Sequence, residues 1–180
     1  AWNAGRHVMI DKAPIKASDY VQRDVWCAAM NATSLIGHCR FATSGDPRNN
    51  ANNHPFTSRR YAMVHNGCIA AHKDLAAEKR VQLESECDSE VILRIVSDRV
   101  NKGESLQKAV ETMAGSVGWR GDYAVALMDK RNGSVMLFRD DGRPCAILRI
   151  PATRTVFFAS TDDILLAALE RVSKVVTGSE

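Results

Sequence analysis

The sequence lacks the patterns that mark secreted and membrane-spanning proteins. Its five cysteines are odd in number and scattered, and no two form a C-x-x-C pair. Such usage fits free thiols in a reducing, cytoplasmic compartment better than a disulfide framework. The chain has no apolar run of 18 residues, and its first residues do not read as a secretory signal. We therefore expect no membrane contact and no export.

The sequence also has little excess of charge and no low-complexity tract. Its 24 Lys and Arg residues against 21 Asp and Glu give a formal charge of +3, too small for a dedicated nucleic-acid binder. Adjacent basic residues occur only as isolated pairs, such as Arg59-Arg60 and Lys79-Arg80. A chain of 180 residues with ordinary composition can bury a core of its own, so we expect one domain over residues 1–180.

Two short apolar runs flank one long polar segment. Residues 35–42 and 61–65 read as buried strands, and the second is expected to end in a tight turn at Asn66-Gly67. The polar segment between them, residues 44–60, is the one long irregular stretch. Segments of this length are more often functional than idle, although a disordered surface loop is the alternative.

The rest of the chain divides into a helical block and a strand block. Helical spacing of apolar residues predicts helices over 88–100, from 106 to 113, and after 161. Between the last two, residues 122–129, 134–139, 145–150 and 154–159 are predicted to form an antiparallel meander. Elements that come in blocks indicate an α+β fold of stacked layers.

Residues 38–90 hold the densest run of polar side chains beside apolar strands. Arg40 ends a predicted strand, and Asp88 begins a predicted helix, where free backbone N–H groups stabilise a carboxylate. Together they could anchor the carboxylate and ammonium groups of a free amino acid. The Asn66 amide beside the Gly67 N–H could form an oxyanion hole. Taken singly, such residues more often make ion pairs and turns.

Four motifs occur in order across this region. They are GHCRFATSG at 37–45, NHPF at 53–56, VHNG at 64–67 and SECDSE at 85–90. In sequence and spacing they resemble the glutaminase domain of class II glutamine amidotransferases, which are N-terminal-nucleophile hydrolases. The resemblance implies a four-layer αββα sandwich, two mostly antiparallel sheets between helical layers. It implies no metal and no cofactor.

The resemblance also implies roles for single residues. Arg40 would bind the α-carboxylate of L-glutamine and Asp88 its α-amino group, while Thr43 and Ser44 would line the pocket. Ser44 stands where relatives often carry histidine. Asn66, through its side-chain amide, and Gly67, through its backbone N–H, would be the catalytic pair that forms the oxyanion hole.

This sequence differs from the family's pattern at the nucleophile. The family's chemistry uses an N-terminal cysteine whose own α-amine moves the proton, whereas this chain begins at Ala1. Asn3-Ala-Gly5 resembles a family segment that follows the nucleophile, so the first strand and the cysteine are expected upstream. The alternatives are an inactive glutamine- or glutamate-binding module, or Cys39 or Cys68 as a substitute. The resemblance also implies an ammonia-accepting synthase domain or subunit as partner.

A metal site is the alternative of a different class. Its ligands would be His38, His54, His65 and His72 with nearby cysteines, but no H-x-x-x-H or C-x-x-C occurs. We expect instead that His54 hydrogen-bonds the long polar segment and that His65 packs at a strand end.

Overall fold

A four-stranded antiparallel sheet forms the centre of the protein. The computed structural model describes residues 1–5, 7–40 and 44–177, with side chains described up to residue 172. The strands of the central sheet lie in the order β3 (Phe56–Thr57), β4 (Tyr61–Ile69), β5 (Gly121–Asp129) and β6 (Val135–Arg139). The long pair β4–β5 runs in register from Tyr61 opposite Asp129 to Ile69 opposite Gly121.

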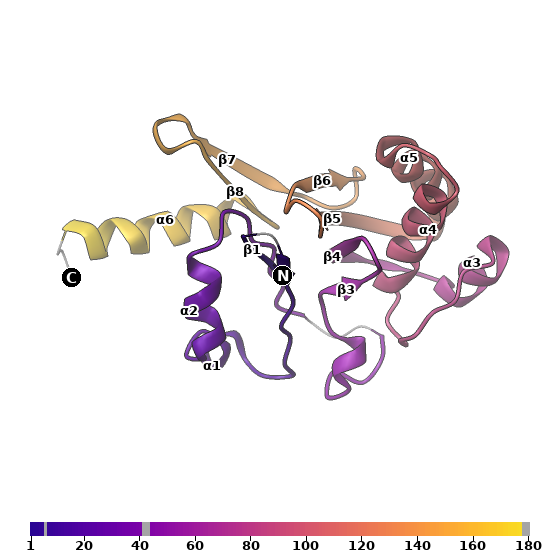
Figure 1. The fold of residues 1–180 in the computed structure, drawn as a ribbon, viewed down its shortest axis with the longest axis horizontal. Helices are drawn as coiled ribbons and strands as arrows, with labels where there is room; N and C mark the ends of the chain where they lie inside the picture. The colour runs from indigo at the N-terminus through magenta and orange to yellow at the C-terminus, as the bar shows by residue number, and fades with distance from the viewer. Residues whose placement is uncertain (6, 41–43, 178–180) are drawn as a thin grey trace.

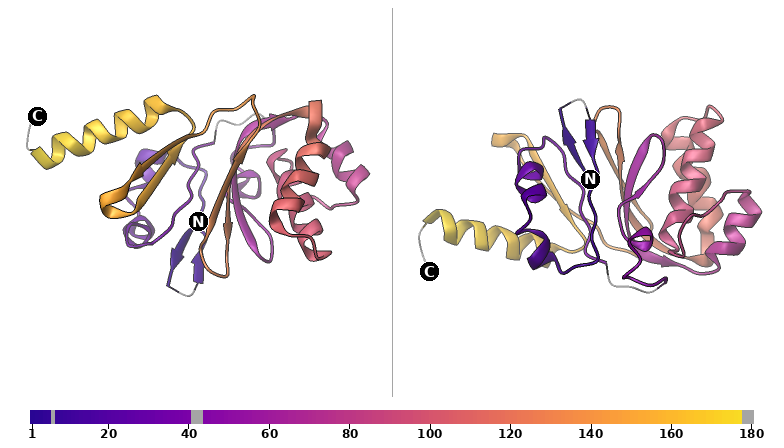
Figure 2. Two further views of the ribbon diagram at one scale, coloured as in Figure 1. Left: turned by 90° about the horizontal axis from the view of Figure 1, so that it is seen from above. Right: turned by 60° about the horizontal axis from the view of Figure 1, so that its bottom comes forward.

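Helices cover one face of this sheet, as Figure 2 shows. They are α3 (His72–Lys79), α4 (Ser89–Asn101) and α5 (Leu106–Val117). Alternate residues of a strand point to the same face, so the odd-numbered residues Met63, Val125 and Leu127 of β4 and β5 pack against the apolar stripe of α4, whose Val91 and Ile92 are fully buried. This is the larger of two apolar cores.

Residues from two hairpins pack against the other face. Even-numbered residues such as Val64 and Ala126 form a second core there, joined by Ala1 and Ile36 and by the partly buried Phe158. The hairpins are β1 (Trp2–Ala4) with β2 (His7–Met9), and β7 (Ala146–Ile150) with β8 (Thr155–Ala159). In Figure 1 the second hairpin runs away from the central sheet.

The remaining helices lie beyond the hairpins. They are α1 (Ala17–Tyr20), α2 (Asp24–Met30) and α6 (Asp162–Thr177), and short 3₁₀ turns occur at η1 (Asn50–Asn52), η2 (Gly118–Arg120) and η3 (Pro151–Thr153). The helix α6 packs on β7 and β8 and extends beyond them (Figure 1). The fold is thus mixed α+β with antiparallel sheets, as predicted. Within the described ranges, no helix has the length and apolar character that a membrane crossing needs.

Several predicted elements are present, and others are wrong. The helices near 88–100, 106–113 and after 161 and all four strands after residue 120 are confirmed. The four strands after residue 120 do not form one meander as predicted, because β7 and β8 pair with each other in a separate sheet and not with β6. Residues 35–40 do not form a regular strand. They make only an isolated bridge between Leu35 and Trp2, and residues 41 and 42 lie outside the described part.

The predicted turn at Asn66-Gly67 is also wrong. Strand β4 continues through both residues to Ile69. Gly67 has a φ of +149°, and a Cβ on it would lie 2.1 Å from the backbone oxygen of Asp122. Glycine is needed at this position because the two strands approach each other closely, and not because the chain reverses direction.

Candidate functional site

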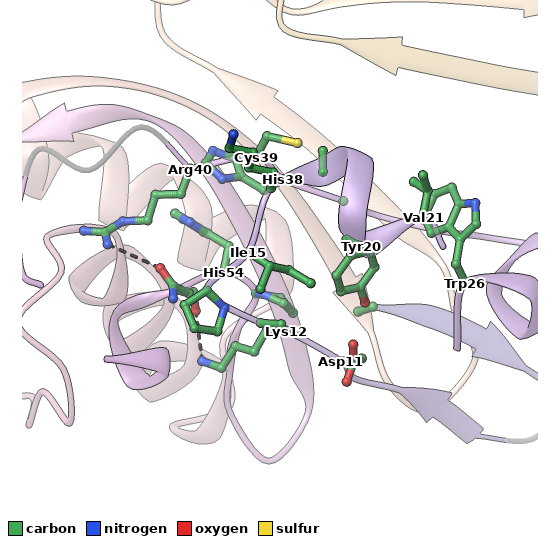
Figure 3. A pocket seen from close by; sticks show the side chains of 18 of the residues that line it. Asp11, Lys12, Ile15, Tyr20, Val21, Trp26, His38, Cys39, Arg40 and His54 are labelled. Carbon is green, nitrogen blue, oxygen red and sulfur yellow. Dashed lines mark hydrogen bonds between the residues drawn. The ribbon is translucent and has the colours of Figure 1, made fainter. Parts of the chain in front are cut away.

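Arg40 follows the extended segment that crosses the second core. Its guanidinium donates to Asn53 Oδ1 at 3.3 Å and to the backbone oxygens of Ser44 and Gly45. Figure 3 shows the side chain reaching across toward the loop, where the Nζ of Lys12 also donates to the Asn53 carbonyl at 2.9 Å. Arg40 is therefore held in place by the long polar segment, which is ordered around it.

The long polar segment is bonded to the residues that precede α4. Ser44 Oγ donates to the carbonyl of Glu86 at 2.8 Å. Asn52, fully buried, accepts the Glu86 N–H at 2.9 Å and donates to its carboxylate at 3.0 Å. These bonds bring Arg40 and Ser44 to the segment that carries Asp88. Thr43 lies outside the described residues.

Asp88 lies at the start of α4 and closes the edge of β4. It is 3% exposed, and its Oδ2 accepts the backbone N–H of Ile69 at 2.7 Å. The predicted stabilisation by the N–H groups of the helix is wrong, because the carboxylate makes no capping bond to α4. Alternate N–H groups of a strand point to the same side, so the Gly67 N–H lies on the same edge as that of Ile69.

Asn66 faces the opposite side of the sheet from α4. It lines a small cavity of about 100 Å³ together with Val64, Ala126 and Phe158. A larger cavity of about 940 Å³ is lined by Arg40 and extends toward α1 (Figure 3). Gly37 and His38 line both cavities and so form a wall that the two cavities share. Arg40 lines the larger cavity beside this wall, and Asn66 lines the smaller one.

Three histidines gather near this wall. The His65 Nδ1 lies 2.8 Å from Ser89 Oγ, which ties β4 to α4 rather than merely filling a strand end. The rings of His38 and His54 lie 4.1 Å apart. Both ring nitrogens of His54 are buried without a partner among the described residues, so its predicted hydrogen bond to the loop is wrong. Among the residues that the structure describes, no three His, Cys, Asp or Glu side chains form a group that could hold a metal.

Glu90 is a buried carboxylate that lies in the SECDSE motif but to which the sequence assigned no role. It is 2% exposed and accepts hydrogen bonds from the N–H and Oγ of Ser85, both at 2.7 Å, and from Arg94. Burial would raise the pKa of Glu90, but the hydrogen bonds from Ser85, Glu84 and Arg94 outweigh it and lower the pKa. The SECDSE motif contained the signal, since a serine five residues before a glutamate at a helix start permits this contact. Through these hydrogen bonds Glu90 fixes the loop that presents Asp88.

Asp122 and Arg143 were also missed. Asp122 Oδ1 accepts the Cys68 N–H at 3.2 Å and the Nε of Arg143 at 2.8 Å. No sequence motif indicates this pair, because Asp122 lies on β5 and Arg143 in the turn after β6, and the two meet only when the sheet forms.

Comparison with known proteins decides the family. The model of a family described as a glutamine amidotransferase domain matches residues 38–167. The chain belongs to this family. The match starts at His38 and so includes the motifs that carry Arg40, Asn66, Gly67 and Asp88, and the predicted class II amidotransferase relationship is confirmed.

Relatives of this amidotransferase domain are longer proteins. The glutamine–fructose-6-phosphate aminotransferase (isomerizing) of Halalkalibacterium halodurans is 28% identical over 185 residues, which cover 98% of this chain and 30% of the relative. That of Bacillus subtilis is 33% identical over 150 residues, covering 79% and 23%. A solved glutamine phosphoribosylpyrophosphate amidotransferase from B. subtilis aligns with a TM-score of 0.49 at 19% identity, over 63% of this chain and 25% of that chain. The chain thus spans less than a third of the curated relatives described here.

We expect the histidines at the cavity wall to make the stability of the amidotransferase domain sensitive to acid. Burial, reinforced by His65 and Arg40, lowers the pKa of His38 to about 4. In the unfolded chain the pKa of a histidine is about 6.5. Between pH 6.5 and 4, His38 therefore binds a proton in the unfolded chain but not in the folded chain. Stability from this group is complete above pH 6.5, and about 2 kcal/mol of it is lost between pH 7.5 and 5. Urea unfolding across this range measures the loss.

The variant His38→Gln should flatten this dependence, while His7→Gln, at an exposed position on β2, should leave it unchanged. An equal loss of stability in wild type and His38→Gln would show that His38 does not titrate in this way.

Proposed function

We propose that this amidotransferase domain binds L-glutamine and hydrolyses its side-chain amide to glutamate and ammonia. The observation that carries the proposal is the position of the segment before α4. It is bonded to the Arg40 loop through Ser44 and Glu86, and to the Gly67 edge of β4 through Asp88 and Ile69. The groups needed for an amino acid and for an oxyanion are thereby tied to one short piece of chain.

In this proposal the charged groups orient the substrate. Arg40 binds the α-carboxylate, exchanging carbonyl partners in the loop for a charged one, which makes a stronger hydrogen bond. Asp88 binds the α-ammonium group while its Oδ2 keeps the Ile69 N–H. Thr43 and Ser44 complete the pocket, and the Asn66 amide and Gly67 N–H receive the developing oxyanion.

The reaction requires a nucleophilic thiol. A cysteine sulfur attacks the amide carbon and forms a C–S bond, and the nitrogen leaves as ammonia with a proton returned by the α-amine. Water then cleaves the thioester, releasing glutamate and restoring the thiol. We place this cysteine in a segment before Ala1, which would also add the opening strand. An internal thiol such as Cys39 or Cys68 fits poorly, because it lacks the free α-amine that activates the nucleophile, and burial also raises the pKa of Cys68.

The proposal extends to architecture and partner. Residues 1–180, with that opening segment, would make a single four-layer αββα domain in which the two hairpins belong to one second sheet. The ammonia would pass to a synthase domain or subunit, as the name of the longer relatives suggests. Five free thiols suit a cytoplasmic setting.

Ammonia release from glutamine tests the proposal, using protein that starts at its native cysteine. We expect turnover in wild type, and at least a hundredfold loss of glutamine affinity in Arg40→Ala and Asp88→Ala, since each removes a charge-assisted contact. The matched control is Arg48→Ala, because Arg48 lines the same cavity but pairs with Asp46 at the surface.

Two outcomes would contradict the proposal. Unchanged turnover in both site variants would remove Arg40 and Asp88 from the site. Calorimetric binding of glutamine or glutamate without ammonia release would instead support the inactive binding module.

A further inference from the structure

The peptide that follows Gly67 is held from the side opposite Asp88. The Cys68 N–H points toward β5, where the carboxylate of Asp122 accepts it at 3.2 Å. On the other edge, the Ile69 N–H donates to Asp88 at 2.7 Å. The Gly67–Cys68–Ile69 stretch is therefore fastened on both edges by side chains.

A folded turn after β6 brings Arg143 to Asp122. The Oδ1 of Asp140 accepts the N–H groups of Tyr123, Gly142 and Arg143 at 3.1 to 3.2 Å. A Cβ on Gly142 would lie 2.8 Å from the Cβ of Asp122, so the turn packs directly on this residue. From there Arg143 Nε donates to Asp122 Oδ1 at 2.8 Å.

The ion pair also sets the charge beside the candidate oxyanion hole. A bare carboxylate next to the Gly67–Cys68 peptide would oppose an oxyanion formed nearby, and the guanidinium of Arg143 cancels that charge. Consistent with this, Arg143 and the Cys68 N–H outweigh burial and lower the pKa of Asp122. Both residues are about one-third exposed, so neither is needed to fill the core.

We propose that Asp122 and Arg143 are positioning residues: Asp122 fixes the Gly67–Cys68 peptide, and Arg143 cancels the negative charge that Asp122 would otherwise place beside the oxyanion hole. The inference rests on the proposed function for its catalytic part only. The structural part concerns the Cys68 N–H and stands without turnover.

Amide hydrogen exchange tests the structural part on the full chain. We expect the Cys68 amide to exchange about tenfold faster in Asp122→Ala, which removes its acceptor, with a smaller increase in Asp122→Asn, which retains an oxygen. The matched control is Asp129→Asn at the far end of β5, where the carboxylate pairs with Arg60. This control should affect exchange near Tyr61 and leave Cys68 unchanged. Equal Cys68 exchange in Asp122→Ala and wild type would overturn the proposal.

Steady-state kinetics of ammonia release test the catalytic part. Arg143→Gln leaves the Asp122 charge uncompensated and should lower kcat at least tenfold with little change in KM, because the oxyanion exists only in the transition state. Adding Asp122→Asn to Arg143→Gln removes that charge and should restore part of kcat. An unchanged kcat in Arg143→Gln, or no recovery in the double variant, would overturn the charge role. Wild-type protein without turnover would overturn the proposed function, while the exchange experiment would still judge the positioning.

Discussion

Replacing Gly67 by alanine is expected to lower the free energy of unfolding by about 3 kcal/mol or more, because it combines backbone strain with overpacking. The new Cβ would lie 2.1 Å from the Asp122 oxygen and 2.6 Å from the Nε2 of His65. Strands β4 and β5 would have to separate at the point where the site lies. Chemical denaturation followed by circular dichroism measures the loss, and glutamine turnover should disappear with it.

The matched control is Gly115→Ala. Gly115 lies on the exposed side of α5, and a Cβ there would meet no atom within 4 Å. Alanine is the better helix former, so this variant should gain up to about 1 kcal/mol. The two substitutions are chemically identical and should differ in sign. A Gly67→Ala protein as stable as wild type would contradict the close strand approach described here.

Removal of the Glu90 carboxylate is expected to have the second-largest effect. Glu90→Ala leaves the Ser85 and Glu84 N–H groups without their acceptor and removes the buried one of the two carboxylates that pair with Arg94. Breaking a buried ion pair of this kind costs about 3 to 5 kcal/mol. The control Glu111→Ala removes an exposed pair with Lys108 and should cost less than about 1 kcal/mol. Thermal unfolding compares the two, and equal losses would contradict the role of Glu90.

Glu90 also predicts an acid dependence with a defined sign. Because its folded pKa is lowered, its stabilisation is complete above the unfolded glutamate pKa of about 4.3. It is lost as the pH falls through the folded pKa. In Glu90→Gln the loss of stability below pH 4.3 should therefore be smaller than in wild type, which separates Glu90 from the histidine effect at higher pH.

Local periodicity made much of the fold predictable. The apolar spacing of residues 88–100 encodes one buried face, so α4 follows from the sequence alone. The strands β5 and β6 could be predicted from the sequence in the same way. By contrast, the extended segment at 35–40 is held against the start of the chain, where Ile36 and Ala1 exchange hydrogen bonds. No local pattern specifies such a distant partner.

The site was predictable as a set of residues but not as a geometry. The motifs identified Arg40, Asn66 and Asp88, yet the Asn-Gly pair also fits a turn, and only the partner strand decides that Gly67 sits inside a ladder. In the same way, a carboxylate at a helix start normally caps the helix. Asp88 binds Ile69 instead, because the edge of β4 leaves that donor without a strand neighbour.

The shortness of β3 has a consequence for the behaviour of the protein in solution. With two residues, β3 covers β4 only opposite Ala62 and Met63, and the rest of that edge is a template on which another chain could add a strand. The Asp88 carboxylate occupies one of the donors on that edge, the buried N–H of Ile69, and a charged side chain at a strand edge disfavours the addition of another strand. The residues that make the edge a candidate site therefore also guard it against edge-to-edge association.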